Sequence, residues 1–210
     1  MIIAIDGPAA AGKGTLTRKL AKYYNLALLD TGLIYRAVGL KAVLNGDPSD
    51  SEIAIQAAKS IDLADLKIHG IRGELAAKSA SLVAAIPAVR DVLLEFQREF
   101  AHNPPDGKLG SILDGRDIGT VVCPDAKIKL FITASLEVRT DRRYKELQER
   151  GEEAIRSAVL DDIKTRDERD IARALSPLKP AGDAKIIDSS DFNASEVFSL
   201  AQEFISSQMK

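Results

Sequence analysis

The chain has 210 residues, with 29 Lys or Arg against 31 Asp or Glu, and a formal net charge of −2. This length suits one domain with a sizeable core, and the balanced charge argues against a dedicated polyanion binder such as a DNA-coating protein. The single cysteine, Cys123, excludes an internal disulfide and fits a reducing cytosol. The N-terminus reads as a strand rather than a signal peptide, and no apolar run reaches the roughly 18 residues of a membrane span. We therefore expect a cytoplasmic protein without nucleic-acid or membrane partners.

Short apolar runs alternate along the chain with segments of helical periodicity. The expected strands are Ile2–Ile5, Leu26–Leu29, Leu109–Leu113, Ile128–Ile132 and Lys185–Ile187. The expected helices are Thr15–Ala21, Thr31–Leu44, Ser51–Ile61, Glu74–Ile86, Ala88–Phe100, Ser135–Gln148, Glu153–Leu175 and Asn193–Ser206. The strands are hydrophobic almost throughout, which is typical of a parallel sheet covered on both faces. The alternation predicts an α/β fold with a doubly wound, five-stranded parallel sheet.

The segment 47–103 is too long for a simple crossover between two strands. It contains several predicted helices and one extended piece, Leu66–His69. We expect a core of about residues 1–46, 104–140 and 176–210, with a mostly helical insert at about 47–103 and a short helical lid at about 141–175. The insert is a natural place to bind a second substrate.

A phosphate-binding pattern lies at the start of the chain. Gly7, Gly12 and Lys13 have the G-x-x-x-x-G-K spacing, directly after the first strand and before the first helix. Glycines let consecutive N–H groups point at an anion, the helix N-terminus adds partial positive charge, and the lysine reaches the outer phosphates. An ordinary glycine-rich turn is the alternative, but the strand–turn–helix context favours a phosphate-binding loop.

The residue after the lysine, Gly14, indicates which class of phosphate-binding loop this is. The general motif has Ser or Thr there to hold Mg²⁺, whereas this chain has Gly14, with the hydroxyl one position later at Thr15. We therefore expect Mg²⁺ to be held by nucleotide and water, without a direct protein ligand, and carboxylates to assist from outside. The loop is closer to those of nucleoside monophosphate kinases than to those of switch GTPases, and the chain has no Asn-Lys-x-Asp motif for reading guanine.

Further polar residues follow the second and third strands. Ligands gather at the carboxyl ends of strands in open α/β sheets, so Thr31 and Arg36 should face the same crevice as the loop, although Thr31 also suits a helix N-cap. Asp114 is placed as a metal-assisting carboxylate. An Asp-Gly turn is the alternative there, but it leaves unexplained why Arg116 and Asp117 follow at once. These two side chains can read a phosphate and a polar base edge together.

A row of arginines lies in the last third of the chain. Arg166, Arg169 and Arg173 are spaced i, i+3 and i+7, which places them on one face of a helix. A solvated, salt-bridged helix is the usual outcome for such charge runs. With a phosphate loop upstream, a lid that neutralises the transferring phosphates is the more attractive interpretation.

Together these motifs resemble the bacterial-type cytidylate kinases, a family of P-loop nucleoside monophosphate kinases. The resemblance extends from residue 2 to about residue 190 and includes further matches at Tyr35, Ser81 and Arg90. It implies that ATP and CMP or dCMP, with Mg²⁺, give ADP and CDP or dCDP, in an enzyme that is monomeric. It implies a phosphate site made by Gly7, Pro8, Ala10, Ala11, Gly12, Lys13, Gly14 and Thr15.

The resemblance also implies an acceptor site and a catalytic set of cations. The acceptor site comprises Thr31, Tyr35, Arg36, Ser81, Arg90, Asp114, Arg116, Asp117, Arg169 and Asp170. Lys13, Arg166 and Arg173 would be catalytic, acting on the transferring phosphoryl group. His69, His102 and Cys123 are assigned no role. The alternatives are another small-molecule P-loop kinase or, from a different class, a nucleotide-dependent switch.

Overall fold

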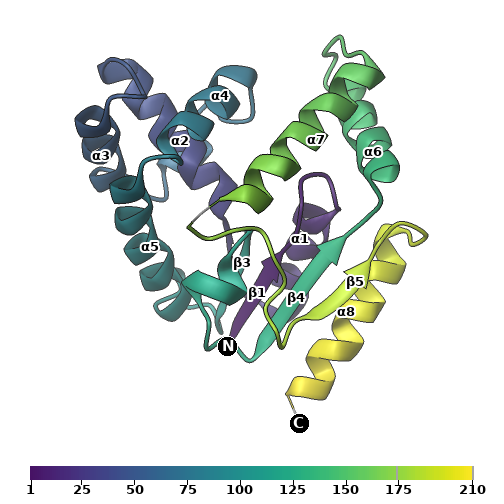
Figure 1. Cartoon of the computed structure of the whole chain (residues 1–210). Helices are drawn as coiled ribbons and strands as arrows, with labels where there is room; N and C mark the ends of the chain where they lie inside the picture. Colours follow the sequence, from purple (N-terminus) through teal and green to yellow (C-terminus); the bar gives the residue numbers. More distant parts are fainter. Residues whose placement is uncertain (174, 210) are drawn as a thin grey trace. The chain divides into compact units, whose positions relative to one another are not determined.

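A computed structural model describes residues 1–173 and 175–209 (Figure 1). The strands are β1 (Ile2–Asp6), β2 (Ala27–Asp30), β3 (Ser111–Gly115), β4 (Ile128–Thr133) and β5 (Lys185–Asp188). The α-helices are α1 (Lys13–Tyr24), α2 (Thr31–Asn45), α3 (Ser51–Lys59), α4 (Glu74–Val83), α5 (Pro87–His102), α6 (Leu136–Glu149), α7 (Arg156–Ala172) and α8 (Ala194–Gln208). A 3₁₀ turn, η1 (Asp65–Lys67), and a π-helical turn, η2 (Ile118–Val122), complete the described elements.

The strands form one five-stranded sheet in the order β2-β3-β1-β4-β5. The central strand β1 pairs in parallel with β3 and β4, and β4 pairs in parallel with β5. In register, Ile3 lies between Ile112 and Ile128. The predicted five-stranded parallel α/β fold is therefore confirmed. This arrangement places the carboxyl ends of β1 and β3 side by side, at Asp6 and Gly115.

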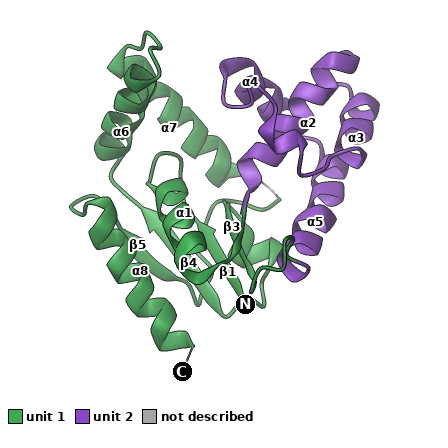
Figure 2. Ribbon diagram, turned by 180° about the vertical axis from the view of Figure 1, so that it is seen from behind, with its two compact units in different colours: residues 1–28, 104–210 green, residues 29–103 purple. Residues whose placement is uncertain are grey.

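Apolar residues of the sheet form one core with helices α1 and α8. Leu16 and Leu20 of α1, and Ala201 and Ile205 of α8, belong to the same buried cluster as Ile5 of β1. The two helices lie on the same face of the sheet, the one turned towards the viewer in Figure 2. Each large aliphatic side chain buried in this way contributes about 1.5–3 kcal/mol relative to exposure. The packing fixes α1, and with it the loop that precedes α1.

The chain divides into two compact units (Figure 2). Unit 1 comprises residues 1–28 and 104–210, and unit 2 comprises residues 29–103. Helix α2 belongs to unit 2, where it packs closely against α4: a Cβ added to Gly39 would lie 2.6 Å from Oγ of Ser79. The division into core, insert and lid expected from the sequence stays a prediction, with the difference that residues 29–46 group here with the helical unit.

The piece Leu66–His69, expected to be extended, is part of a turn instead. The 3₁₀ turn η1 begins at Asp65, whose carboxylate accepts the Nζ of Lys41 at 2.6 Å. Asp62 accepts the N–H groups of Ala64 and Asp65 at 2.7 and 3.1 Å. Aspartates that bond to nearby backbone groups in this way compete with strand pairing.

Helix α7 is shorter than the expected Glu153–Leu175, since it begins at Arg156 and ends at Ala172. Arg173 has extended backbone angles of φ −58° and ψ 130°, so it follows the helix rather than lying on it. The carbonyl of Asp170 accepts the N–H of Leu178 at 2.8 Å, because the chain turns back over the helix end. The expected helical face of three arginines therefore loses its third member. The expected end of that helix also covers Ala174, which lies outside the described residues.

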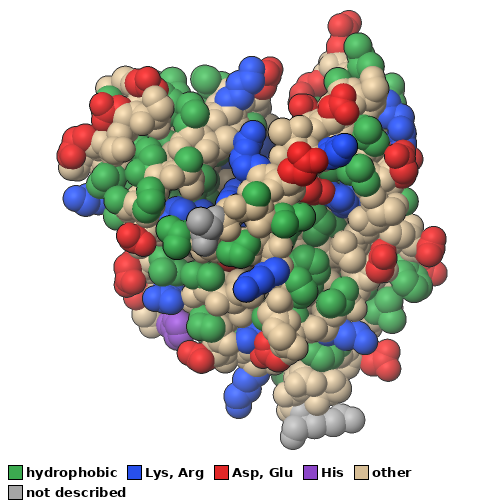
Figure 3. Space-filling model, in the orientation of Figure 1, with side chains coloured by type: hydrophobic (Ala, Val, Ile, Leu, Met, Phe, Trp, Pro, Cys, Tyr) green, Lys and Arg blue, Asp and Glu red, His purple; other side chains and the backbone are tan. Residues whose placement is uncertain are grey.

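Acidic and basic side chains are interspersed over the face of the molecule seen in Figure 3. Among the described residues, no helix is both long and apolar enough to cross a membrane.

Candidate active site

The loop Gly7–Thr15 joins β1 to α1, and its backbone has three residues with positive φ. Gly7 has φ +143°, and a Cβ added there would lie 1.9 Å from the carbonyl oxygen of Ile132. Gly12, at φ +90°, is the N-cap of α1. Ala10 adopts φ +59°, a conformation that non-glycine residues rarely take. Such strain concentrates at ligand-binding segments, so these backbone angles are compatible with the predicted anion-binding loop.

Lys13 is the first residue of α1 and is only 6% exposed. Its Nζ donates to the carbonyl oxygens of Gly7 and Pro8, both at 2.8 Å, and lies 3.9 Å from Oδ1 of Asp114. Burial, and then the positive charge of Arg116, lower the pKa of Lys13 to about 7, although Asp114 opposes this shift. An anion bound in the loop would favour the protonated form of Lys13, as the charges of Asp114 and Asp6 do.

Asp6 ends β1 immediately before the loop and is 4% exposed. Its two carboxylate oxygens accept the N–H groups of Ile118 and Gly119, both at 2.8 Å. Burial raises the pKa of Asp6 to about 6. No role for Asp6 was predicted from the sequence. Its position between a buried strand and Gly7 could have indicated that this carboxylate contributes to the site. Through these two hydrogen bonds, Asp6 fixes the start of η2, the segment that follows Asp117.

Several residues predicted from the sequence meet at the end of β3. Asp170, buried at the end of α7, accepts Nε of Arg116 at 3.0 Å and forms an ion pair with Nη2 of Arg173 at 2.5 Å. The positive charge of Arg166 is close enough to lower the pKa of Lys13. Arg166 and Arg169 are themselves exposed. Unit 1 therefore contains one cluster of positively and negatively charged side chains. Its members are Lys13, Asp114, Arg116, Asp170 and Arg173.

The donor set around Gly14 suits Mg²⁺ that is bound through phosphate and water. The Oδ2 atom of Asp114 lies 3.9 Å from the position of a Cβ added to Gly14, and the Thr15 hydroxyl is one residue further. In the described chain, no group of three or more His, Cys, Asp or Glu side chains could form a metal cage. Mg²⁺ needs few protein ligands and keeps several waters, so a carboxylate such as Asp114 beside the loop would be sufficient.

Five further predicted residues belong to unit 2. Thr31, which is buried, begins α2, and one turn later the ring of Tyr35 lies 5.7 Å from Cζ of Arg90 on α5. Arg36 donates to the carbonyl oxygens of Ile71 and Gly73 at 3.2 and 3.3 Å, next to the start of α4. Ser81, exposed on α4, donates to the carbonyl of Ala77 at 3.2 Å. Unit 2 thus pairs Tyr35 with Arg90 and holds Arg36 at the α4 N-terminus.

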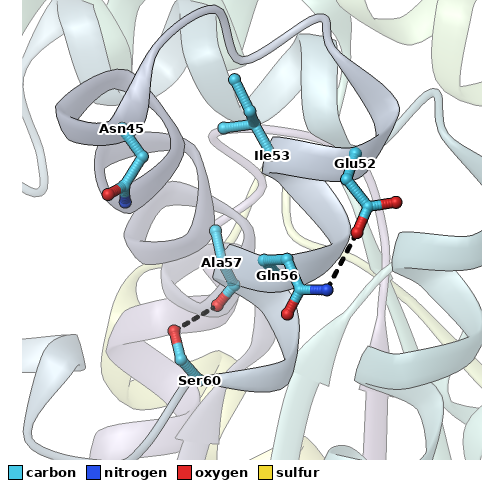
Figure 4. A pocket seen from close by; sticks show the side chains of 6 residues that line it. All are labelled: Asn45, Glu52, Ile53, Gln56, Ala57 and Ser60. Atoms are coloured by element: carbon cyan, nitrogen blue, oxygen red, sulfur yellow. Dashed lines mark hydrogen bonds between the residues drawn. The ribbon is translucent and has the colours of Figure 1, made fainter.

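A separate cavity of 360 Å³ lies where the end of α2 meets α3 (Figure 4). It is lined by Asn45, Glu52, Ile53, Gln56, Ala57 and Ser60. Gln56 bonds to Glu52, and Ser60 bonds to the carbonyl of Ala57. These residues are not among those predicted from the motifs, and the cavity has no cationic lining residue that would suit a phosphate.

Comparison with known proteins identifies the family. A family model described as cytidylate kinase matches residues 3–207. The chain belongs to the cytidylate kinase family. It is 56% identical to the cytidylate kinase of Paramagnetospirillum magneticum over 99% of this chain and 98% of the relative. It is 51% identical to that of Methylocella silvestris over 99% of this chain and 94% of the relative.

Two solved structures resemble the fold. An uncharacterised protein from Eubacterium ventriosum matches with a TM-score of 0.55 at 16% identity, covering 99% of both chains. A Thermus thermophilus protein matches with a TM-score of 0.51 at 16% identity, covering 100% of this chain and 98% of that one. At this identity they support the α/β architecture of this cytidylate kinase family member and nothing finer.

Proposed function

We propose that the chain transfers the γ-phosphoryl group of ATP to CMP or dCMP, giving ADP and CDP or dCDP. Membership of the cytidylate kinase family makes it a nucleoside monophosphate kinase. The single observation that supports the chemistry best is the loop Gly7–Thr15, whose buried Lys13 is held beside Asp114 at the end of β3. An ATP phosphate chain bound there would lie against the helix N-terminus and the lysine.

Phosphoryl transfer passes through a loose transition state, so positioning and charge stabilisation matter more than a general base. The attacking oxygen of CMP is already anionic, and no group has to remove a proton from it. On the donor side the loop residues Gly7, Pro8, Ala10, Ala11, Gly12, Gly14 and Thr15 would bind phosphates. Lys13, Arg166 and Arg173 would stabilise charge on the transferring group. Mg²⁺, held by phosphate oxygens and water with help from Asp114, would neutralise part of the same charge.

Each unit holds candidate residues for binding the acceptor. Thr31, Tyr35, Arg36, Ser81 and Arg90 are the candidates in unit 2, and Arg116, Asp117, Arg169 and Asp170 are those in unit 1. Arg116 and Arg173 both pair with Asp170 in the free chain. An arriving phosphate can take over one of these cations, because the guanidinium fork suits phosphate as well as carboxylate. A monomeric enzyme in the cytoplasm is part of the same proposal, and the single buried Cys123 is compatible with it.

A panel of acceptors tests the proposal. The protein is incubated with ATP and Mg²⁺ and, separately, with CMP, dCMP, UMP, AMP, dTMP or no acceptor, while ADP release is followed. We expect release only with CMP and dCMP. Release with AMP or dTMP alone would indicate another small-molecule kinase. Slow release that is independent of any acceptor would indicate a nucleotide-dependent switch.

A further inference from the structure

The carbonyl groups of the loop need hydrogen-bond donors, because backbone carbonyls away from water are almost always paired. Lys13 satisfies Gly7 and Pro8 from within the loop. The carbonyl of Ala9, in contrast, accepts Nη1 of Arg139 at 3.3 Å. Arg139 lies on α6, far from the loop in sequence.

A second carbonyl of the loop also depends on α6. Ala11 accepts the hydroxyl of Ser189 at 3.1 Å, and Ser189 in turn accepts Nη1 of Arg142 at 2.8 Å. Nη2 of the same arginine donates to the carbonyl of Ser189 at 2.7 Å. Helix α6 therefore holds two carbonyls of the loop. Arg139 binds the carbonyl of Ala9 directly, and Arg142 positions Ser189, which binds the carbonyl of Ala11.

Arg139 is the more deeply buried of the two arginines, at 6% exposure. Its Nε donates to the carbonyl of Ala134 at 2.9 Å, which fixes the guanidinium at the start of α6. Its Nη1 also forms an ion pair with Oδ2 of Asp167 at 2.6 Å. A buried arginine of this kind is tolerated because it is paired, and removing one partner leaves an uncompensated charge.

Asp167 connects this pair to α7. It directly precedes Glu168 and follows Arg166, and it lies three residues before Asp170, which holds Arg116 and Arg173. Its Oδ1 atom is buried and, within the described chain, has no hydrogen-bond partner. The position of Asp167 therefore depends on Arg139.

We propose that Arg139 is a positioning residue that connects the donor loop to α7 through Asp167. It sets the distance between Lys13 in the loop and the arginines at the end of α7. The inference rests on the proposed kinase function, in which the loop and these arginines act on one phosphoryl group. Because misplacing a reacting group by about 1 Å can cost about 10²-fold in rate, the pair should affect turnover more than affinity.

The same two helices offer a matched control. Arg156 on α7 forms ion pairs with Glu137 and Asp141 on α6, both at 2.6 Å. Those pairs are exposed and do not contact the loop. Arg156→Gln thus removes an α6–α7 link of similar length without disturbing Ala9.

The test compares Asp167→Asn, Arg139→Lys, the double variant and Arg156→Gln in the assay with ATP and CMP. Asp167→Asn keeps the shape of the side chain and is expected to fold, which circular dichroism and thermal unfolding would verify. We expect kcat to fall about 10- to 100-fold in each of the first two variants, with both KM values within about threefold. The double variant should be no slower than about the slower single variant, because the two residues act as one unit. Arg156→Gln should stay within about twofold of the wild type.

Two results would overturn the positioning role. One is a folded Asp167→Asn variant with kcat within about twofold of the wild type, and the other is a pair of losses that simply multiply in the double variant. A wild-type protein that releases no ADP in the presence of CMP would instead refute the proposed function. The two failures are therefore distinguishable in one experiment.

Discussion

The candidate residues of the two units differ in burial and in the contacts that hold them. In unit 1, Lys13 and Asp170 are buried, and each has a charged partner within 4 Å. In unit 2, Arg36 is half-buried against backbone carbonyls, and Ser81 is exposed. The candidates of unit 1 are thus held by buried charged partners, whereas Arg36 and Ser81 of unit 2 are held by hydrogen bonds to backbone carbonyls, which a substrate would replace at lower cost. Variants in unit 1 should consequently have larger effects than variants in unit 2.

Gly7→Ala should have the largest effect on stability. The added Cβ would meet the backbone carbonyl of Ile132 at 1.9 Å, and neither β1 nor β4 can move without disrupting the sheet. We expect the free energy of unfolding to fall by about 4 kcal/mol, measured by urea denaturation. Gly182→Ala is the control, since a Cβ there would meet nothing within 4 Å. Equal stability of the two variants would refute the assigned role of Gly7.

Lys13→Ala should lower kcat by about 10²- to 10³-fold, since in the proposed mechanism its charge stabilises the developing charge of the transferring group. Steady-state kinetics with ATP and CMP would measure this. Near-normal turnover in this variant would exclude Lys13 from the chemistry.

The buried Lys13 should also make stability depend on pH. Its pKa is lowered to about 7 in the folded free protein, so above that pH the unfolded chain holds a proton that the folded chain has released. The free energy of unfolding therefore rises with pH between about 7 and 10 for this group. Relative to Lys13→Met, the wild type should gain about 2 kcal/mol between pH 7 and pH 9, measured by denaturation at each pH. A constant difference between the two proteins would show that Lys13 keeps its proton.

Arg116→Ala should raise the KM for CMP about tenfold or more, because the proposed charge-assisted hydrogen bond to the acceptor would be lost. The KM for ATP should change little. Arg98→Ala, which removes an exposed partner of Glu95 on α5, is the matched control. If ATP binding alone were weakened, Arg116 would belong to the donor site.

Tyr35→Leu should have the smallest effect, a rise of about two- to fivefold in the KM for CMP. The ring lies under Arg90 and both residues are half-buried, so we expect this cation–π contact to contribute about 1 kcal/mol. Tyr35→Phe keeps the ring and should behave like the wild type. Equal impairment of both variants would assign the effect to the hydroxyl group instead.

The sequence was most informative where local chemistry decides the structure. The apolar runs predicted every strand, with ends within two residues of those observed, because buried parallel strands need continuous hydrophobicity. The glycine spacing predicted the loop, because φ +143° at Gly7 requires that residue type.

The sequence was least informative where the outcome depends on contacts distant in the chain. Arg139 was only one of several arginines in a basic stretch, and nothing local showed that it would meet Ala9 and Asp167. The end of α7 was misplaced because the bond from Leu178 to Asp170 depends on how the chain returns to the helix. The roles assigned to the individual site residues stay predictions for the kinetics to test.

Ala10 has a consequence for the entropy of nucleotide binding. A non-glycine residue at φ +59° costs roughly 1–2 kcal/mol, which the folded chain bears whether or not a nucleotide is present. In return, the loop samples fewer conformations than it would with glycine at this position. ATP then has less disorder to remove when it binds, so part of its affinity is set during folding.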